Sequence, residues 1–100
     1  MNLDAERALY SHDPQPVDID FDWDEANEEK LLLRHFVRAE EVEQVFYNRP
    51  MVRRQGNDYV AVAQTDAGRW LKVFFERRSS SVRPYSARDL TESEKRRIVR

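Results

Sequence analysis

A small set of residues has the side chains needed to cleave an RNA phosphodiester bond. Cleavage without a metal ion needs a base for the 2′-hydroxyl, an acid for the leaving 5′-oxygen, and cations that stabilise the charged phosphate. His35 can accept and donate a proton near neutral pH, and Arg34 precedes it directly. Arg83 and Arg88 could bind the phosphate, with Ser86 between them as a hydrogen-bond donor. These are the candidate catalytic residues, although His35 could instead be a charge partner for a helix dipole.

A second group of residues suits contact with single-stranded RNA, because arginines bind phosphates and aromatic rings stack on unpaired bases. The candidate RNA-binding residues are Arg69, Lys72, Arg77, Arg78 and Tyr85, with Tyr59 and Trp70 interleaved. Tyr85 could replace Ser86 as the residue that donates a hydrogen bond to the phosphate. The competing interpretation places Trp70 in the core and makes the arginines strand-edge charges that discourage aggregation.

Neither a metal nor a cofactor is expected. His12 and His35 have no ligand spacing, and the chain contains no cysteine. Four alternating aspartates before the first predicted helix resemble a calcium loop, but Trp23 stands where that loop needs glycine. Gly56 and Gly68 are too few for a glycine-rich phosphate loop.

Charge is divided unevenly along the 100 residues, which are enough for one domain. Residues 1–29 hold ten acids and one base, a net charge of −9, whereas residues 30–100 hold sixteen bases and nine acids, a net charge of +7. The basic part therefore favours an anionic partner, nucleic acid above all. The whole chain holds 14 arginines against three lysines, which suits phosphate binding, but a GC-rich genome would give the same excess. We expect a cytoplasmic protein without membrane contact, since no signal peptide or spanning segment is evident.

The elements that must position these residues follow from periodicity and capping. Helices are predicted at about 25–35, after Asp24 as N-cap, at about 39–47, and at about 91–99 after Thr91. The predicted strands cover 19–23, 51–54, 59–64, 69–76 and 82–87, with the fourth of these central because both of its faces are apolar. The expected fold class is α+β: a small antiparallel meander of three to four strands, two N-terminal helices and a C-terminal helix.

Residues 1–19 read as an acidic N-terminal arm, separate from a domain over 20–100, because a proline-containing polar stretch interrupts regular structure. The arm could fold back over the basic sheet as a mimic of RNA. The alternative is a disordered tail.

Short motifs then follow one another in a recognisable order. They are Phe21-Asp22-Trp23-Asp24, Arg34-His35, Glu40-Glu41-Val42 with Val45-Phe46, Thr65-Asp66-Ala67-Gly68-Arg69, Arg83-Pro84-Tyr85-Ser86-Ala87-Arg88, and Glu92 to Arg97. In this order and spacing, residues 20–98 resemble the BrnT family of bacterial ribonuclease toxins from type II toxin–antitoxin systems.

This resemblance implies a RelE-like architecture and an endoribonuclease that inhibits translation. The implied partner is a cognate antitoxin with a ribbon-helix-helix DNA-binding part, so that operator DNA is reached only through the antitoxin. The matching site positions are Arg34, His35, Arg83, Ser86 and Arg88. Two other functions stay open: an inactive relative that binds RNA or an antitoxin-like protein without cutting, and an adaptor whose basic face docks on an acidic protein.

The sequence also departs from the usual family pattern. Phe36 stands where the family usually has glycine, and the family's usual lysine and asparagine in the first helix fall on Asn27 and Leu31. Glycine can form a left-handed helix cap, so we expect Phe36 to adopt that conformation only with difficulty.

Overall fold

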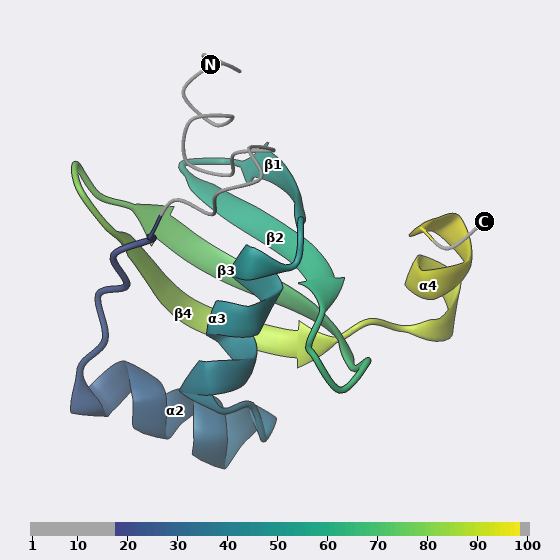
Figure 1. Cartoon of the computed structure of the whole chain (residues 1–100), viewed down its shortest axis with the longest axis horizontal. Coiled ribbons are helices and arrows are strands. Elements are labelled where there is room, and N and C mark those ends of the chain that lie inside the picture. The colour runs from purple at the N-terminus through teal and green to yellow at the C-terminus, as the bar shows by residue number, and fades with distance from the viewer. Residues whose placement is uncertain (1–17, 99–100) are drawn as a thin grey trace.

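A four-stranded antiparallel sheet forms the centre of the fold in the computed structural model, which describes residues 18–98 (Figure 1). The strands are β1 (Met51–Gln55), β2 (Asp58–Gln64), β3 (Trp70–Arg77) and β4 (Val82–Asp89). Each pairs with its neighbour in the chain, so the predicted α+β fold with an antiparallel meander is confirmed. The proposed N-terminal arm lies almost wholly outside the described residues.

The strand β3 is central, as its sequence predicted, because it pairs with β2 on one side and β4 on the other. Its core-facing residues are Leu71, Val73 and Phe75, which are buried. Its opposite face carries Trp70, Lys72 and Phe74, which are half-buried. This outer face of the sheet therefore offers polar and aromatic groups that the core does not use.

Two helices, α2 (Glu25–His35) and α3 (Ala39–Tyr47), cover the other face of the sheet (Figure 1). Both have the predicted bounds. The three consecutive leucines of α2 differ in burial: Leu31 is buried, whereas Leu32 and Leu33 are 47% and 65% exposed. The residues that α3 buries are Val42, Val45 and Phe46. None of the helices within residues 18–98 is both long and apolar enough to span a bilayer.

The start of α2 is held by a capping box and one buried amide. The backbone N–H of Asn27 donates to the Asp24 carboxylate, and the Asp24 N–H donates to Asn27 Oδ1. The Asn27 side-chain amide also donates to the carbonyls of Asp22 and Pro84, both at 3.1 Å. This asparagine, which replaces the family's usual lysine, therefore fastens the helix start to β4.

Substituting Asn27→Ala should lower the free energy of unfolding by about 2 kcal/mol, because it leaves buried backbone groups without their hydrogen-bond partners. Urea titration of both proteins would measure the difference. An exposed change on the same helix, Glu28→Ala, is the matched control and should alter the free energy of unfolding by less than about 0.5 kcal/mol. Equal stability of wild type and Asn27→Ala would contradict this role.

The prediction of a strand over residues 19–23 is wrong, because the structure has a single bridge residue there, Phe21. Phe21 forms only an isolated parallel bridge with Val82, supported by hydrogen bonds from the Asp22 N–H to the Val82 carbonyl and from the Val82 N–H to the Asp20 carbonyl. The alternating apolar residues do face the core, but the N-cap at Asp24 turns the chain into α2 before a longer ladder can form.

The end of α2 corrects the expectation for Phe36, which does adopt the left-handed conformation, with φ 55° and ψ 38°. Its N–H donates to the Leu32 carbonyl, and the next N–H, that of Val37, donates to Leu31. Val37 is thereby buried fully in the core. These bonds and this burial offset the cost of about 1–2 kcal/mol that a side chain imposes there.

The last helix, α4 (Glu92–Ile98), follows β4 and has no fully buried residue. The predicted capping box is present: the Thr91 N–H donates to Glu94, and the Glu94 N–H donates to Thr91 Oγ1. A pocket of about 360 Å³ separates α4 from the outer face of the sheet, between Ile98 on the helix and Val60 and Val62 on β2. The helix thus covers the outer face without packing tightly against it.

Candidate active site

Two cations lie directly opposite each other on the outer face of the sheet. Lys72 on β3 is the cross-strand partner of Arg88 on β4. Like charges in this position repel each other unless an anion lies between them. Glu94 of α4 supplies that anion: its carboxylate accepts from Arg88 at 2.7 and 2.9 Å and from Lys72 at 3.3 Å. Two sequence-predicted residues therefore form one anion-binding site.

This anion site is only partly shielded from water, since the side chain of Arg88 is 42% exposed. The side chains of Lys72 and Glu94 are only 13% and 16% exposed. The hydrogen bond from Arg88 holds the pKa of the Glu94 carboxyl well below its usual range, with further help from the Thr91 N–H and Lys72. Ser86, half-buried, lies two residues along β4 and is paired with Phe74. A phosphate bound at the anion site would thus lie near the Ser86 hydroxyl, because the Phe74–Ser86 pair follows the Lys72–Arg88 pair along the outer face.

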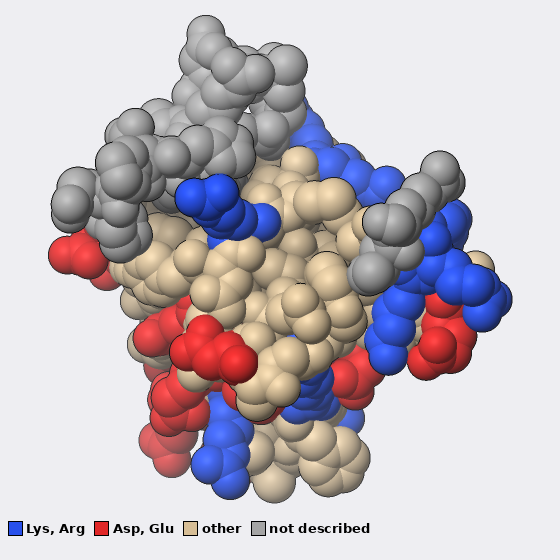
Figure 2. Space-filling model, turned by 45° about the vertical axis from the view of Figure 1, so that its right-hand side comes forward, with Lys and Arg blue, Asp and Glu red and all other residues tan. Residues whose placement is uncertain are grey.

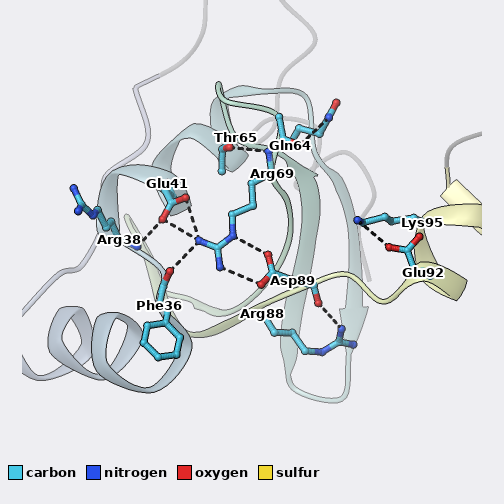
Figure 3. A network of polar contacts seen from close by, with 11 residues as sticks. Phe36, Arg38, Glu41, Gln64, Thr65, Arg69, Arg88, Asp89, Glu92 and Lys95 are labelled. Carbon is cyan, nitrogen blue, oxygen red and sulfur yellow. Dashed lines mark hydrogen bonds and ion pairs between the residues drawn. The ribbon is translucent and has the colours of Figure 1, made fainter.

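Arg69 forms the centre of a second polar network (Figure 3). Its guanidinium donates to both oxygens of Asp89 at 2.7 and 3.1 Å, and to both oxygens of Glu41 at 3.2 Å. A further bond of 2.9 Å reaches the carbonyl of Phe36. Asp89 is the main cause of the raised pKa of Arg69, and Arg69 in turn lowers the pKa of Asp89. Arg69, predicted to bind RNA, is already satisfied by groups of its own chain.

The two networks are continuous. Arg88 donates not only to the anion site but also to the Asp89 carbonyl at 3.1 Å, while Arg69 binds the Asp89 carboxylate. A chain of hydrogen bonds therefore runs from the carbonyl of Phe36, at the end of α2, to Arg88 on β4. His35 directly precedes Phe36, but within residues 18–98 no hydrogen bond joins the His35 side chain to either network.

Arg83 lies in a different place from Arg88. It donates to Asp24 at 2.8 Å and to the Asp22 carbonyl at 3.4 Å, near the start of α2. Five residues of extended strand correspond to about 16 Å, so the two arginines cannot bind one phosphate together. Arg78, another predicted RNA-binding residue, joins the Arg83 group through Asp22 at 3.5 Å.

The remaining predicted residues are spread over the domain. The Tyr85 hydroxyl donates to Asp58 at 2.8 Å, and burial together with that carboxylate raises the pKa of Tyr85 to about 12. Arg77 lies over the ring of Tyr59, 5.4 Å from its centre. Arg34 is exposed and His35 half-buried at the end of α2. No groups of three His, Cys, Asp or Glu that could hold a metal ion occur within residues 18–98.

Sequence reasoning missed the carboxylates that bind the arginines. Glu41, Asp89 and Glu94 lie 28, 20 and 6 residues from their arginine partners, so no local pattern pairs them. Glu94 belongs to the capping box of α4 and also binds Lys72 and Arg88 across the sheet. Figure 2 shows the result on the surface, where acidic and basic side chains lie close together rather than forming one continuous basic face.

These ion pairs predict acid sensitivity. Glu94 and Asp89 have pKa values below their ordinary 4.5 and 3.8 in the folded chain, so unfolding takes up protons at low pH. Their stabilising contribution is complete above the unfolded values and is lost as pH falls through the folded values. We expect the melting temperature to decline on acidification below about pH 4.5. Glu94→Gln should melt lower at pH 7 and lose less on acidification, whereas parallel curves would refute the assignment.

The fold and this site define a small α+β protein in which two cross-strand cations share one carboxylate. Residues 23–94 match the family described as the ribonuclease toxin BrnT of type II toxin–antitoxin systems. The chain therefore belongs to the BrnT family. No curated protein matches the sequence.

A solved structure supports the fold. The crystal structure of the Brucella abortus ribonuclease toxin BrnT, at 1.1 Å resolution, is similar over 75% of this chain and 100% of its own. The TM-score is 0.59 at 15% sequence identity. At this identity the likeness concerns the arrangement of helices and strands, and residue roles must be argued from this chain.

Proposed function

We propose that this protein is an endoribonuclease toxin that cuts RNA without a metal ion. The observation that carries the proposal is the anion site, where Lys72 and Arg88 face each other across two strands with a single carboxylate between them. A phosphate oxygen can take the place of that carboxylate, because both ions accept charge-assisted hydrogen bonds of the same kind. RNA is the proposed substrate because the chain belongs to a family of ribonuclease toxins.

The proposed reaction needs only groups that the chain contains. The ribose 2′-oxygen attacks the adjacent phosphorus, and the bond to the 5′-oxygen breaks, leaving a 2′,3′-cyclic phosphate and a free 5′-hydroxyl. His35 takes the proton of the attacking 2′-hydroxyl and delivers it to the leaving 5′-oxygen, so that the histidine ends the reaction in its starting protonation state. Arg88 and Lys72 stabilise the charge that develops on the phosphate, and Ser86 donates a hydrogen bond to it. Arg34 and the more distant Arg83 bind neighbouring phosphates.

The test is cleavage of a single-stranded RNA by the purified protein in EDTA, with mass spectrometry of the products. A cyclic phosphate end is expected. The double variant His35→Ala, Arg83→Ala should be inactive, with circular dichroism to check its fold. Intact RNA after incubation with wild type, or cleavage by the double variant, would refute the proposal.

We further propose that a cognate antitoxin with a ribbon-helix-helix DNA-binding part neutralises this protein and alone brings it to operator DNA. Family membership implies an antitoxin, and the exposed Leu32 and Leu33 offer an apolar surface beside Arg34. Co-expression with the product of the adjacent reading frame should give a complex that binds operator DNA. The toxin purified alone should leave that DNA unbound.

The alternative function is an inactive family member that binds RNA or an antitoxin without cutting. Its specific support is that Arg83 and Arg88 are both held by carboxylates of the same chain. Induced expression in bacteria separates the two functions, because an active ribonuclease toxin should arrest growth and the inactive module should not.

A further inference from the structure

Phe36 presents an aromatic ring to solvent at a position next to the candidate catalytic histidine. Its side chain is 76% exposed, more than that of any other large apolar residue within residues 18–98. In the part of the chain that is described, no ring contact to Phe36 is found. Burial in the core therefore does not explain this ring.

The backbone of Phe36 is also in a conformation that a side chain rarely adopts, with φ 55°. Three hydrogen bonds hold it there: its own N–H binds the Leu32 carbonyl, the Val37 N–H binds the Leu31 carbonyl, and its carbonyl accepts from Arg69. Strained residues held in this way are typical of functional sites. Glycine would fill the position without strain, so the ring is costly to the fold.

The network fixes the backbone from which the ring projects. Figure 3 shows the Phe36 ring directed away from Arg69, while the carbonyl of the same residue faces the guanidinium. Because the backbone is held at both the N–H and the carbonyl, a ligand that binds the ring causes little loss of backbone freedom.

We propose that Phe36 stacks on an unpaired nucleobase of the RNA substrate, beside the phosphate that His35 acts on. This inference rests on the proposed ribonuclease function. Single-stranded nucleic acids bind where aromatic rings alternate with cations, since rings stack on bases and cations bind phosphates. Arg34 and Arg38 flank the ring in sequence, both exposed, and neither guanidinium has a carboxylate partner within residues 18–98.

A protein partner is the competing ligand, because Leu32 and Leu33 extend the apolar surface. The two arginines favour RNA, since they supply phosphate-binding groups two residues before and two residues after Phe36. Stacking needs an aromatic ring, whereas an apolar contact with a protein needs only a large apolar side chain. Phe36→Leu therefore distinguishes the two ligands.

The experiment uses a single-stranded 2′-O-methyl oligonucleotide with 2-aminopurine at one position, which cannot be cleaved because it lacks a free 2′-hydroxyl. Stacking on the ring should quench the fluorescence. Phe36→Leu should weaken binding by about tenfold or more and remove the quenching, whereas Phe36→Trp should retain both. Leu33→Ala removes another exposed apolar side chain, from the last turn of α2. It is the matched control and should bind the oligonucleotide as wild type does.

Two further measurements separate the effect of the ring on RNA binding from effects on folding and on charge. Phe36→Gly should raise the melting temperature by about 4–8 °C while binding weakens, since glycine removes backbone strain together with the ring. The dependence of affinity on salt should be unchanged in Phe36→Leu and shallower in Arg34→Ala.

Unchanged binding by Phe36→Leu, or equal losses in Phe36→Leu and Leu33→Ala, would overturn the stacking proposal. A wild-type protein that cleaves RNA but leaves the fluorescence unquenched would overturn stacking alone. A protein that neither binds nor cleaves would overturn both proposals.

Discussion

Replacing His35 by alanine should slow RNA cleavage by about 100- to 10,000-fold, the range that a general acid or base contributes. The effect on folding should be small, below about 1 kcal/mol in the free energy of unfolding, because His35 is only half-buried at the end of α2. Single-turnover cleavage of a labelled RNA, with enzyme in excess, measures the chemical step without a contribution from product release.

Two variants sharpen that result. His35→Gln keeps hydrogen-bonding capacity but cannot transfer a proton, so it should be as slow as His35→Ala. Glu29→Ala is an exposed change on the same helix and should cleave at the wild-type rate. Cleavage by His35→Ala within about threefold of wild type would remove His35 from the mechanism, and the helix-dipole role would then explain the residue.

The helices and the meander were predictable because their signals are local. A capping residue fixes the start of α2 and an apolar stripe fixes α3, and three short connections, at 56–57, 65–69 and 78–81, fix the order of the four strands. The segment around Phe21 was not predictable to the same degree. Its alternation is typical of a strand, but whether a strand extends depends on a partner about 60 residues away, Val82.

The candidate site was predictable in composition but not in geometry. The sequence indicated that arginines and a lysine would gather on the last strands, and Lys72 and Arg88 do face each other there. It gave no sign that Glu94 would bind both, because that contact depends on where α4 lies. The left-handed Phe36 was missed for a related reason, since the bond from Arg69 that holds it crosses 33 residues.

The acidic and basic parts of the sequence contact each other in the folded domain. Asp22 and Asp24 belong to the acidic N-terminal part, yet they bind Arg83 at 3.5 and 2.8 Å. The acidic and basic parts thus neutralise each other partly within the domain. Arg34 near the end of α2 and Arg38 at the start of α3 have no carboxylate partner within residues 18–98, so they become the stronger candidates for contact with RNA.

Replacing Arg69 by methionine should lower the free energy of unfolding by about 2–3 kcal/mol and the melting temperature by about 10–20 °C. The change leaves Glu41 and Asp89 without their shared cation and Phe36 without a donor to its carbonyl. The loss stays below that of a fully buried pair, because the Asp89 side chain is 61% exposed and water can solvate it. Guanidinium chloride titration with tryptophan fluorescence measures the loss.

Arg69→Lys tests whether geometry or charge matters. Lysine keeps the positive charge but has a single ammonium group, which cannot bond to both carboxylates and the Phe36 carbonyl in the same forked geometry. It should therefore recover less than half of the lost stability. Arg38→Met removes a nearby arginine that has no carboxylate partner within residues 18–98, and should change the free energy of unfolding by less than about 0.5 kcal/mol.

A double variant at Arg69 and Phe36 tests most strictly whether Arg69 holds the strained backbone of Phe36 in place. If Arg69 holds the strained backbone of Phe36, then Arg69→Met should be less destabilising in a Phe36→Gly background, where glycine adopts the left-handed conformation without strain. We expect the two changes to differ from additivity by about 0.5–1 kcal/mol. Strict additivity would mean that Arg69 stabilises the fold only through its carboxylate partners, and that the local bonds at the end of α2 suffice to hold the ring in place.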